Sequence, residues 1–252
     1  MISAVILAHN DQDIIARAIE SVSWCGEIIV VDDESSDATV ARAKRYTSTV
    51  LHRALGDNFA AQRNAGLAKA KGEWVLFLDS DEVVTDSLKQ EIERVTSENK
   101  TVNGYFLKRT DTLWGRQLRY GETSGVRLLR LAKKGSGVWE RAVHEVWNIH
   151  GTTETLVSPL LHFPHPTVRQ FIADVNWYST INADMLYASK VAAPGWHVVA
   201  YPALKFIRNY IVHLGFLDGV PGLCIAVFMS LHSFLTRGKL YMRYHKKRVP
   251  LP

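Results

Sequence analysis

Three acidic side chains stand within four positions of one another, directly after apolar residues, in the stretch LFLDSDE at 76–82. The carboxylates of Asp79, Asp81 and Glu82 repel one another, and burying any of them without a partner is unfavourable. A positive group must therefore lie beside them, either a metal ion or a basic side chain. Asp79 and Asp81 can reach one hard cation from the same side, and Mg²⁺ and Mn²⁺ prefer such oxygen ligands. An acidic surface turn is the alternative interpretation.

A second acidic pair, Asp32 and Asp33, ends the apolar run EIIVV and precedes ESSDAT. A carboxylate at this point can accept hydrogen bonds from a base or a ribose, and the start of the following helix favours a phosphate. Taken alone, the pattern fits a helix cap and a solvated turn better. The sequence has neither G-x-G-x-x-G nor G-x-x-x-x-G-K-[ST], which argues against a dinucleotide dehydrogenase and a P-loop enzyme.

Two more titratable residues are candidates for chemistry. Glu145, in AVHEVW, lies between apolar residues in a stretch with few other acids, so it is either a general base or the partner of a nearby arginine. His162 ends an apolar run, where it is either a packed core residue or a third metal ligand.

These residues need a scaffold, and the first hundred residues predict one. Apolar runs of strand length alternate with stretches of helical periodicity, which is typical of a parallel sheet covered on both faces. We expect strands at 2–8, 27–33, 49–53 and 73–79, and helices at 11–24, 36–46, 58–72 and 86–99. Such sheets bind ligands at the carboxyl ends of their strands, so the two acidic pairs should face one crevice.

The pattern changes after residue 100. A basic, glycine-punctuated segment of strand character is followed by an expected strand at 155–163 and a long helix at 167–190. We therefore divide the chain into a nucleotide-sugar-binding half at 1–100, an acceptor and catalytic half at 101–192, and a helical extension at 193–252. The roles in this division depend on the resemblance described below.

The extension is apolar, aromatic and basic. Its run GVPGLCIAVFMSL, at 219–231, has thirteen uncharged residues, which is short of the ~20 that span a bilayer as a helix. Clustered Lys and Arg beside this run predict a segment that lies in an anionic membrane interface. A helical hairpin buried on a soluble domain is the alternative.

Composition limits the class of protein. The 252 residues are 47% hydrophobic and 22% charged, as in a globular protein, and the formal net charge of +5 favours anionic partners. The two cysteines, Cys25 and Cys224, form no disulfide framework, and the N-terminal apolar run has no basic flank. We therefore expect a cytoplasmic location.

Taken together, AHNDQDIIARAIESV, EIIVVDDESSDAT, AQRNAGLAKAKGEWVLFLDSDE and VHE resemble the family 2 glycosyltransferases of the GT-A fold, and within them the bacterial branch of lipopolysaccharide core β-1,4-glucosyltransferases. The resemblance implies an α/β fold, Rossmann-like, with a mostly parallel sheet and helices on both faces. The C-terminal helical extension would associate with membranes. His9 and Glu34 depart from the family pattern, since an aromatic residue and a small residue are usual there.

The resemblance also implies roles for individual residues. Asp32 and Asp33 would bind the nucleoside, with Arg63 and Asn64 lining the same pocket. Asp79 and Asp81 would be the D-x-D motif that binds the donor and the metal, Asp81 being the more direct ligand. His162 would be a further metal ligand, and Glu145 the catalytic base.

The implied protein is a metal-dependent, inverting hexosyltransferase. Its cofactor would be Mg²⁺ or Mn²⁺, its donor a nucleotide-sugar such as a UDP-hexose, and its acceptor a lipid-linked saccharide such as lipopolysaccharide core. We expect it to be peripheral on the inner face of the cytoplasmic membrane and to bind no nucleic acid. A nucleotidyltransferase acting on sugar phosphates and a catalytically inactive nucleotide-sugar-binding protein are the alternatives.

Overall fold

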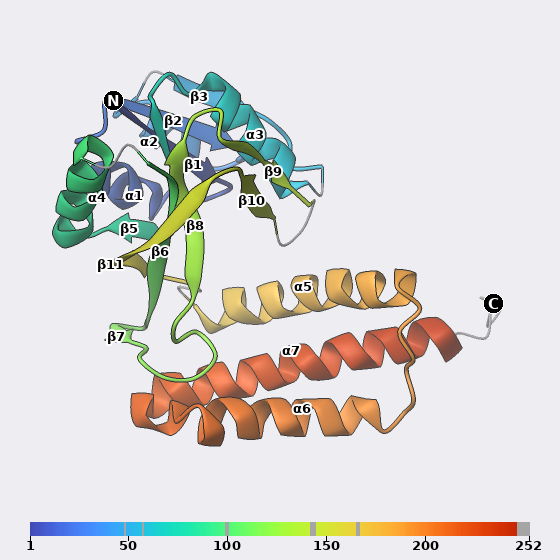
Figure 1. The fold of residues 1–252 in the computed structure, drawn as a ribbon. Helices are drawn as coiled ribbons and strands as arrows, with labels where there is room; N and C mark the ends of the chain where they lie inside the picture. The colour runs from blue at the N-terminus through green and yellow to red at the C-terminus, as the bar shows by residue number, and fades with distance from the viewer. Residues whose placement is uncertain (48, 57, 99–100, 142–144, 165–166, 246–252) are drawn as a thin grey trace. The chain divides into compact units, whose positions relative to one another are not determined.

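The computed structural model describes the chain except for residues 48, 57, 99–100, 142–144, 165–166 and 246–252. It has two compact units (Figure 1). The first comprises residues 1–110 and 125–162, and the second comprises residues 111–124 and 163–252. This division differs from the expected boundaries, because the long helix at 168–188 shares a hydrophobic core with the last helix of the chain.

The first unit begins with the expected alternation of strands and helices. Its strands are β1 (Ile2–Ala8), β2 (Glu27–Asp32), β3 (Thr49–His52) and β4 (Trp74–Asp79). Its helices are α1 (Ile15–Ser21), α2 (Thr39–Ala43), α3 (Phe59–Lys69) and α4 (Asp86–Glu98). β1 pairs in parallel with both β2 and β4, and β2 pairs in parallel with β3. The carboxyl ends of these strands therefore share one edge, as the sequence predicts.

The rest of the first unit extends this sheet with antiparallel strands. β4 pairs with β8 (Arg127–Lys133), which pairs with β6 (Val102–Leu113), and β11 (Thr152–His162) pairs with β5 (Glu82–Val84). The strand order is β3-β2-β1-β4-β8-β6-β11-β5. A separate two-stranded hairpin is formed by β9 (Gly137–Glu140) and β10 (Val146–Ile149). The sheet is thus mixed, with a parallel half that carries both acidic pairs.

Helices cover both faces of the parallel half, which confirms the α/β class. Successive residues of β1 point to opposite faces: Ile6 packs with α1, α2 and α4, whereas Val5 packs with α3 and the β9–β10 hairpin. α3 approaches the sheet closely at Gly66, where a Cβ atom would lie 2.4 Å from a methyl carbon of Val5. The glycine in QRNAG therefore sets the distance between α3 and the sheet.

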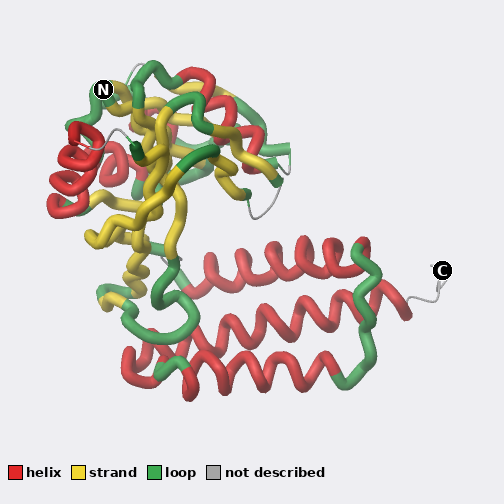
Figure 2. Tube along the Cα trace, viewed as in Figure 1, coloured by secondary structure: helices red, strands yellow, loops and turns green. Residues whose placement is uncertain are grey.

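The second unit is mainly helical (Figure 2). It contains α5 (Val168–Ala188), α6 (His197–Ile207), the π-helix η1 (Arg208–Val212), the 3₁₀-helix η2 (Gly215–Asp218) and α7 (Gly219–His245), together with the short strand β7 (Arg116–Gln117). Phe171 and Val175 of α5 pack on Ile225 of α7, together with Leu113 and Leu118. These contacts form a core of their own.

α7 is longer than the uncharged run at 219–231 suggests, because the helix continues through its basic residues to His245. Pro221 falls in the first turn of α7, where its missing N–H breaks no helical hydrogen bond. In the described part of the chain, the stretch Gly215–His245 is long and apolar enough, by length and composition only, to cross a membrane. The predicted C-terminal helical extension is present.

Candidate active site

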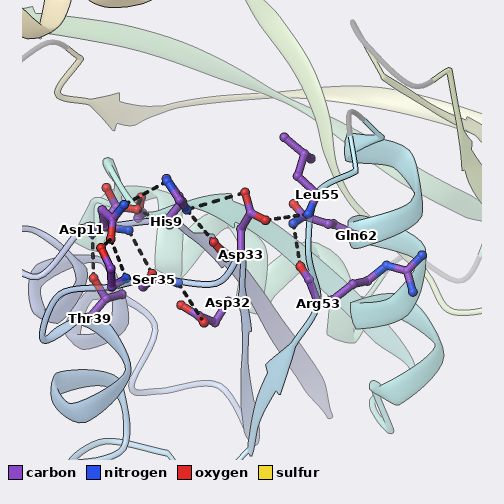
Figure 3. A network of polar contacts seen from close by, with 12 residues as sticks. His9, Asp11, Asp32, Asp33, Ser35, Thr39, Arg53, Leu55 and Gln62 are labelled. Atoms are coloured by element: carbon purple, nitrogen blue, oxygen red, sulfur yellow. Dashed lines mark hydrogen bonds and ion pairs between the residues drawn. The ribbon is translucent and has the colours of Figure 1, made fainter.

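Side chains tie the loops after β1 and β2 together, and Figure 3 shows part of this network. The backbone N–H of Asn10 donates to Ser35 Oγ at 2.9 Å, and the N–H of Ser36 donates back to Asn10 Oδ1 at 2.8 Å. The N–H of Asp11 donates to Thr39 Oγ1 at 2.7 Å. Asn10 adopts a left-handed backbone with φ of 55°, a conformation that asparagine tolerates well. These bonds therefore hold the loops after β1 and β2 against one another at the edge of the sheet.

Asp32 and Asp33 lie within this network but differ in exposure. Asp32 is buried, and its Oδ2 accepts from the N–H of Ser35 at 3.3 Å and lies 3.2 Å from His52 Nδ1. Its Oδ1 is buried and has no hydrogen-bond partner in the described residues. Asp33 is partly exposed, and its Oδ1 accepts from the N–H of Leu55 at 2.5 Å. The pair therefore offers carboxylate acceptors at the strand edge, as the sequence predicts.

Two arginines contact Asp79. Oδ1 of Asp79 lies 2.8 Å from Arg63, and Oδ2 lies 2.5 Å from Arg130. Burial alone would raise the pKa of Asp79, but the two guanidinium charges hold that pKa well below its usual range. Asp79 is therefore an anion with both oxygens engaged.

Glu82 lies beneath the same cluster. It is fully buried, its Oε2 accepts from the N–H of Asp79 at 2.9 Å, and its Oε1 lies 3.5 Å from Arg130. Burial is the largest influence and raises the pKa of the Glu82 carboxyl despite the charge of Arg130. The buried Arg130, on β8, is thus the positive group that the stretch LFLDSDE requires at Asp79 and Glu82.

Asp81 has a different neighbour. Its Oδ2 lies 3.1 Å from Nε2 of His162, and both side chains are partly buried. An oxygen and an imidazole nitrogen fit a divalent cation that takes its other ligands from a diphosphate and water. Among the described residues, this site included, no group of three or more His, Cys, Asp or Glu side chains gathers that could hold a metal by itself. Arginines contact both oxygens of Asp79, and its expected role as a metal ligand stays a prediction.

Asp11 borders the same region from the β1 loop. Its Oδ2 accepts from Ser80 Oγ at 2.5 Å and from the N–H of His9 at 2.8 Å. Burial raises the pKa of Asp11, and the nearby charge of Asp81 acts in the same direction. Asp11 thus connects the first loop to the loop that carries Asp79 and Asp81.

Glu145 lies directly before β10, and Arg63 connects it to the strand-end acids. Arg63 donates from Nε to Oε1 of Glu145 at 2.9 Å, and Nη2 of Arg63 lies 2.8 Å from the same oxygen. The same Nη2 donates to Asp79. One guanidinium therefore bridges the acid expected as the base and the first acid of the D-x-D motif. His144, the neighbour of Glu145, lies outside the described residues.

Asn64, the next residue of α3, binds backbone. Its Nδ2 donates to the carbonyl oxygen of Trp139 at 2.8 Å, and its Oδ1 accepts from the N–H of Trp139 at 2.9 Å. The amide is thus fully used on β9. The resemblance implied a place in the nucleotide pocket for Arg63 and Asn64, and the structure shows both contacting the chain itself.

Sequence reasoning did not identify Arg130, Glu82 or Asp11 as site residues. Arg130 had a usable signal, because an arginine between apolar residues in a strand (LLRLA) must find an acid when its face is buried. Asp11 offered no comparable signal, since an acid after a first strand also fits a helix N-terminus.

The fold and these carboxylates can be compared with known proteins. The family model described as glycosyl transferase family 2 matches residues 3–147, which is more than half of the chain. The chain therefore belongs to glycosyltransferase family 2 and has the GT-A fold expected of it.

Relatives extend over the full length. The chain is 26% identical over 256 residues to the lipopolysaccharide core biosynthesis glycosyltransferase LpsC of Rhizobium meliloti (strain 1021), covering 99% of this chain and 95% of LpsC. It is 26% identical to the uncharacterized glycosyltransferase RP128 of Rickettsia prowazekii (strain Madrid E), covering 95% of this chain and 86% of RP128. The solved structure of S. aureus TarS 1-349 has 13% identity, covers 100% of this chain and 93% of that one, and gives a TM-score of 0.46.

Proposed function

We propose that this glycosyltransferase moves a hexose from a UDP-sugar to a hydroxyl group of a lipid-linked saccharide such as lipopolysaccharide core, with inversion at the anomeric carbon. Membership of family 2 supports the glycosyl transfer in this proposal. It also disfavours the nucleotidyltransferase alternative.

The observation that carries the proposal is the bridge through Arg63. Glu145 and Asp79 are far apart in sequence, yet a single guanidinium contacts both. Asp81 follows Asp79 by two positions and lies beside His162. An acid for proton transfer and donor groups for a diphosphate-bound cation therefore belong to one connected cluster in the first unit.

In the proposed reaction Glu145 accepts the proton of the acceptor hydroxyl. The oxygen attacks the anomeric carbon as the bond from that carbon to the diphosphate oxygen breaks, and the diphosphate leaves with the nucleoside. Asp32 and Asp33 hold the nucleoside through their carboxylates. A divalent cation bound by Asp81 and His162 would supply charge neutralisation to the departing diphosphate. A general base typically contributes roughly 10²–10⁴-fold to the rate.

Similarity to LpsC supports the class of acceptor. The likeness covers nearly all of both chains, including the second unit of this protein, so it is not confined to the family domain. A core saccharide that is attached to lipid lies at a membrane surface, which makes the second unit relevant to the acceptor.

The second unit supports binding to an anionic membrane. Apolar side chains of α6, η1 and the start of α7 are strongly exposed, at 63% for Leu204, 68% for Val212 and 70% for Val220. Such a concentration of exposed apolar side chains is unusual for a surface facing only water.

The charges of this segment favour the same partner. Between residues 185 and 245 the single acid is Asp218, which is buried and accepts from the backbone N–H groups of Arg119 and Tyr120. The basic residues of that segment are Lys190, Lys205, Arg208, Arg237, Lys239 and Arg243. Two of these bases already pair with acids of the second unit, Lys205 with Glu122 and Arg243 with the exposed Asp184. The net positive charge of the segment complements anionic lipid headgroups, each Lys or Arg near them contributing about 1 kcal/mol. We place the protein on the inner, cytoplasmic face of the membrane, where this acceptor would be reached.

A donor screen tests the proposed activity. UDP release is measured from UDP-glucose, UDP-galactose and UDP-N-acetylglucosamine, with Mn²⁺ or Mg²⁺, in the presence and absence of truncated lipopolysaccharide. We expect one donor to give UDP release that depends on the acceptor, with a matching gain in acceptor mass. Binding of UDP with Mn²⁺ but no transfer to any glycolipid of the cell envelope would favour the inactive binding protein instead.

A further inference from the structure

The β9–β10 hairpin determines where Glu145 lies. β9 and β10 form a two-stranded sheet of their own, and Glu145 immediately precedes the first residue of β10. In the described part of the chain, neither β9 nor β10 pairs with a strand of the large sheet, so such pairing does not fix the register of the hairpin. Whatever holds the hairpin therefore also positions the carboxylate of Glu145.

Aromatic rings hold the hairpin against the sheet. Trp139 of β9 stacks on Trp147 of β10 with centroids 5.2 Å apart and planes 19° apart. Both rings meet the ring of Phe77 on β4 edge-on, at centroid distances of 5.1 Å and 4.9 Å. Such contacts attract the hairpin to the sheet. Apolar packing is largely non-directional, however, so it determines the orientation of the hairpin only weakly.

Two adjacent residues of α3 make directional polar contacts that orient the hairpin. The Asn64 amide forms both of its bonds with the backbone of Trp139, as a neighbouring strand would, and so fixes the register of β9. The Arg63 guanidinium carbon lies 4.7 Å from the centroid of a Trp139 ring, while its nitrogens bind Glu145 and Asp79. Arg63 is nearly completely buried, so these carboxylates and the ring are its immediate surroundings.

We propose that Arg63 and Asn64 are positioning residues that hold the β9–β10 hairpin in register and aim the carboxylate of Glu145. The inference rests on the proposed role of Glu145 as the base. It differs from the role that the family resemblance implies, in which both residues line the nucleotide pocket. The two roles have opposite kinetic consequences.

Arg63→Lys separates the two roles, because lysine keeps the charge but lacks the fork that reaches two carboxylates at once. A misplacement of a reacting group by about 1 Å can cost on the order of 10²-fold in rate. Using the donor and truncated lipopolysaccharide of the screen above, we expect kcat to fall by about 10²-fold while the donor KM and the affinity for UDP with Mn²⁺ stay within about threefold. A raised donor KM and weaker UDP binding with an unchanged kcat would overturn the proposal.

A double-mutant cycle tests whether Arg63 acts through Glu145. If it does, Arg63→Lys lowers kcat when it is the only substitution. In a protein that already carries Glu145→Gln, it lowers kcat by less than about threefold further, since the effects of groups that act as a unit are not additive. A double variant in which the two reductions in kcat multiply would contradict the inference. If Glu145→Gln itself turns over like the wild type, the proposed function fails at its base and this inference fails with it. If Glu145→Gln loses turnover but Arg63→Lys raises the donor KM and weakens UDP binding with an unchanged kcat, the proposed function stands and the inference alone is rejected.

Asn64→Ala keeps the buried charges and provides a test that does not depend on turnover. Hydrogen–deuterium exchange of peptides covering β9 and β10 should quicken by about tenfold or more, while exchange in α4 stays unchanged. kcat should fall with the donor KM unchanged. Ile92→Val, in the core at α4, is the control for mild destabilisation and should alter neither hairpin exchange nor kcat. Wild-type exchange and wild-type kcat in a folded Asn64→Ala would exclude the positioning role of Asn64.

Discussion

The Nε2 atom of His162 lies 3.1 Å from a carboxylate oxygen of Asp81, although the two residues are far apart in the sequence. Antiparallel pairing explains the approach, because β11 ends at His162 and pairs there with Glu82, the residue after Asp81. This pairing provides one oxygen and one nitrogen donor on the same edge of the sheet.

The first prediction concerns metal dependence. Asp81→Asn and His162→Gln should each lower turnover on the order of a hundredfold, because each would remove a donor to the proposed cation. UDP binding should weaken in Mn²⁺ but not in chelator. Asp13→Asn, at a strongly exposed acid of the same unit, is the control and should behave like the wild type. Full turnover of the wild type in excess chelator would refute the metal role.

The second prediction concerns the buried cation of the cluster. Arg130→Met should lower the free energy of unfolding by about 3–5 kcal/mol, because it leaves Asp79 and the buried Glu82 with less compensating charge. Chemical denaturation at neutral pH measures this change. A loss below 1 kcal/mol would mean that water replaces the guanidinium easily.

The third prediction is a pH dependence of stability. Arg130 and Arg63 hold the folded-state pKa of Asp79 below its unfolded value, which lies near 4. The ionised carboxylate therefore contributes stability above about pH 4, and that contribution is lost as the pH falls toward the lower folded-state pKa. Asp79→Asn should show a shallower loss of unfolding free energy between about pH 4 and pH 2 than the wild type. Parallel curves would show that the Asp79 charge is not coupled to folding.

The sequence predicted the parallel half of the fold because its signals are local. Apolar runs and helical periodicity predict each of β1 to β4 and α1 to α4, although α1, α2 and α3 are shorter than expected. The strand-end positions of Asp32 and Asp79 follow from that order. The partners of the acids could not be read in the same way. Arg130 and His162 reach Asp79 and Asp81 through long-range pairing of β8 and β11, which has no periodic signature. Arg63 reaches Asp79 from α3.

The C-terminal third shows a second limit. The uncharged run at 219–231 suggested a short segment, yet α7 extends to His245 because Thr236, Leu240 and their neighbours continue a buried stripe between basic residues. Counting uncharged residues alone therefore underestimates a helix whose basic side chains are half-buried and bond to α5, as Lys239 does to Asn176 and Arg243 does to Asp184. Asp218, the residue directly before this run, is a buried acceptor for backbone N–H groups.

The fourth prediction concerns the membrane surface. The wild type should sediment with vesicles containing phosphatidylglycerol more than with phosphatidylcholine vesicles, and salt should weaken this binding only in part. Leu204→Glu combined with Val212→Glu should abolish sedimentation, because it places two carboxylates on the exposed apolar surface of α6 and η1. The matched control is Val157→Glu in the first unit, where Val157 is 79% exposed. Equal binding by all three proteins would contradict the proposed membrane surface.

The central claim is that Glu145 is the catalytic base, and turnover by Glu145→Gln tests it most directly. Glutamine keeps the size of the side chain and can still accept from Arg63, but it cannot take the proton of the acceptor hydroxyl. With the donor and acceptor found in the screen, the account predicts wild-type affinity for UDP with Mn²⁺ and a kcat lowered by roughly 10²–10⁴-fold. A folded Glu145→Gln protein with kcat within a few-fold of the wild type would contradict it.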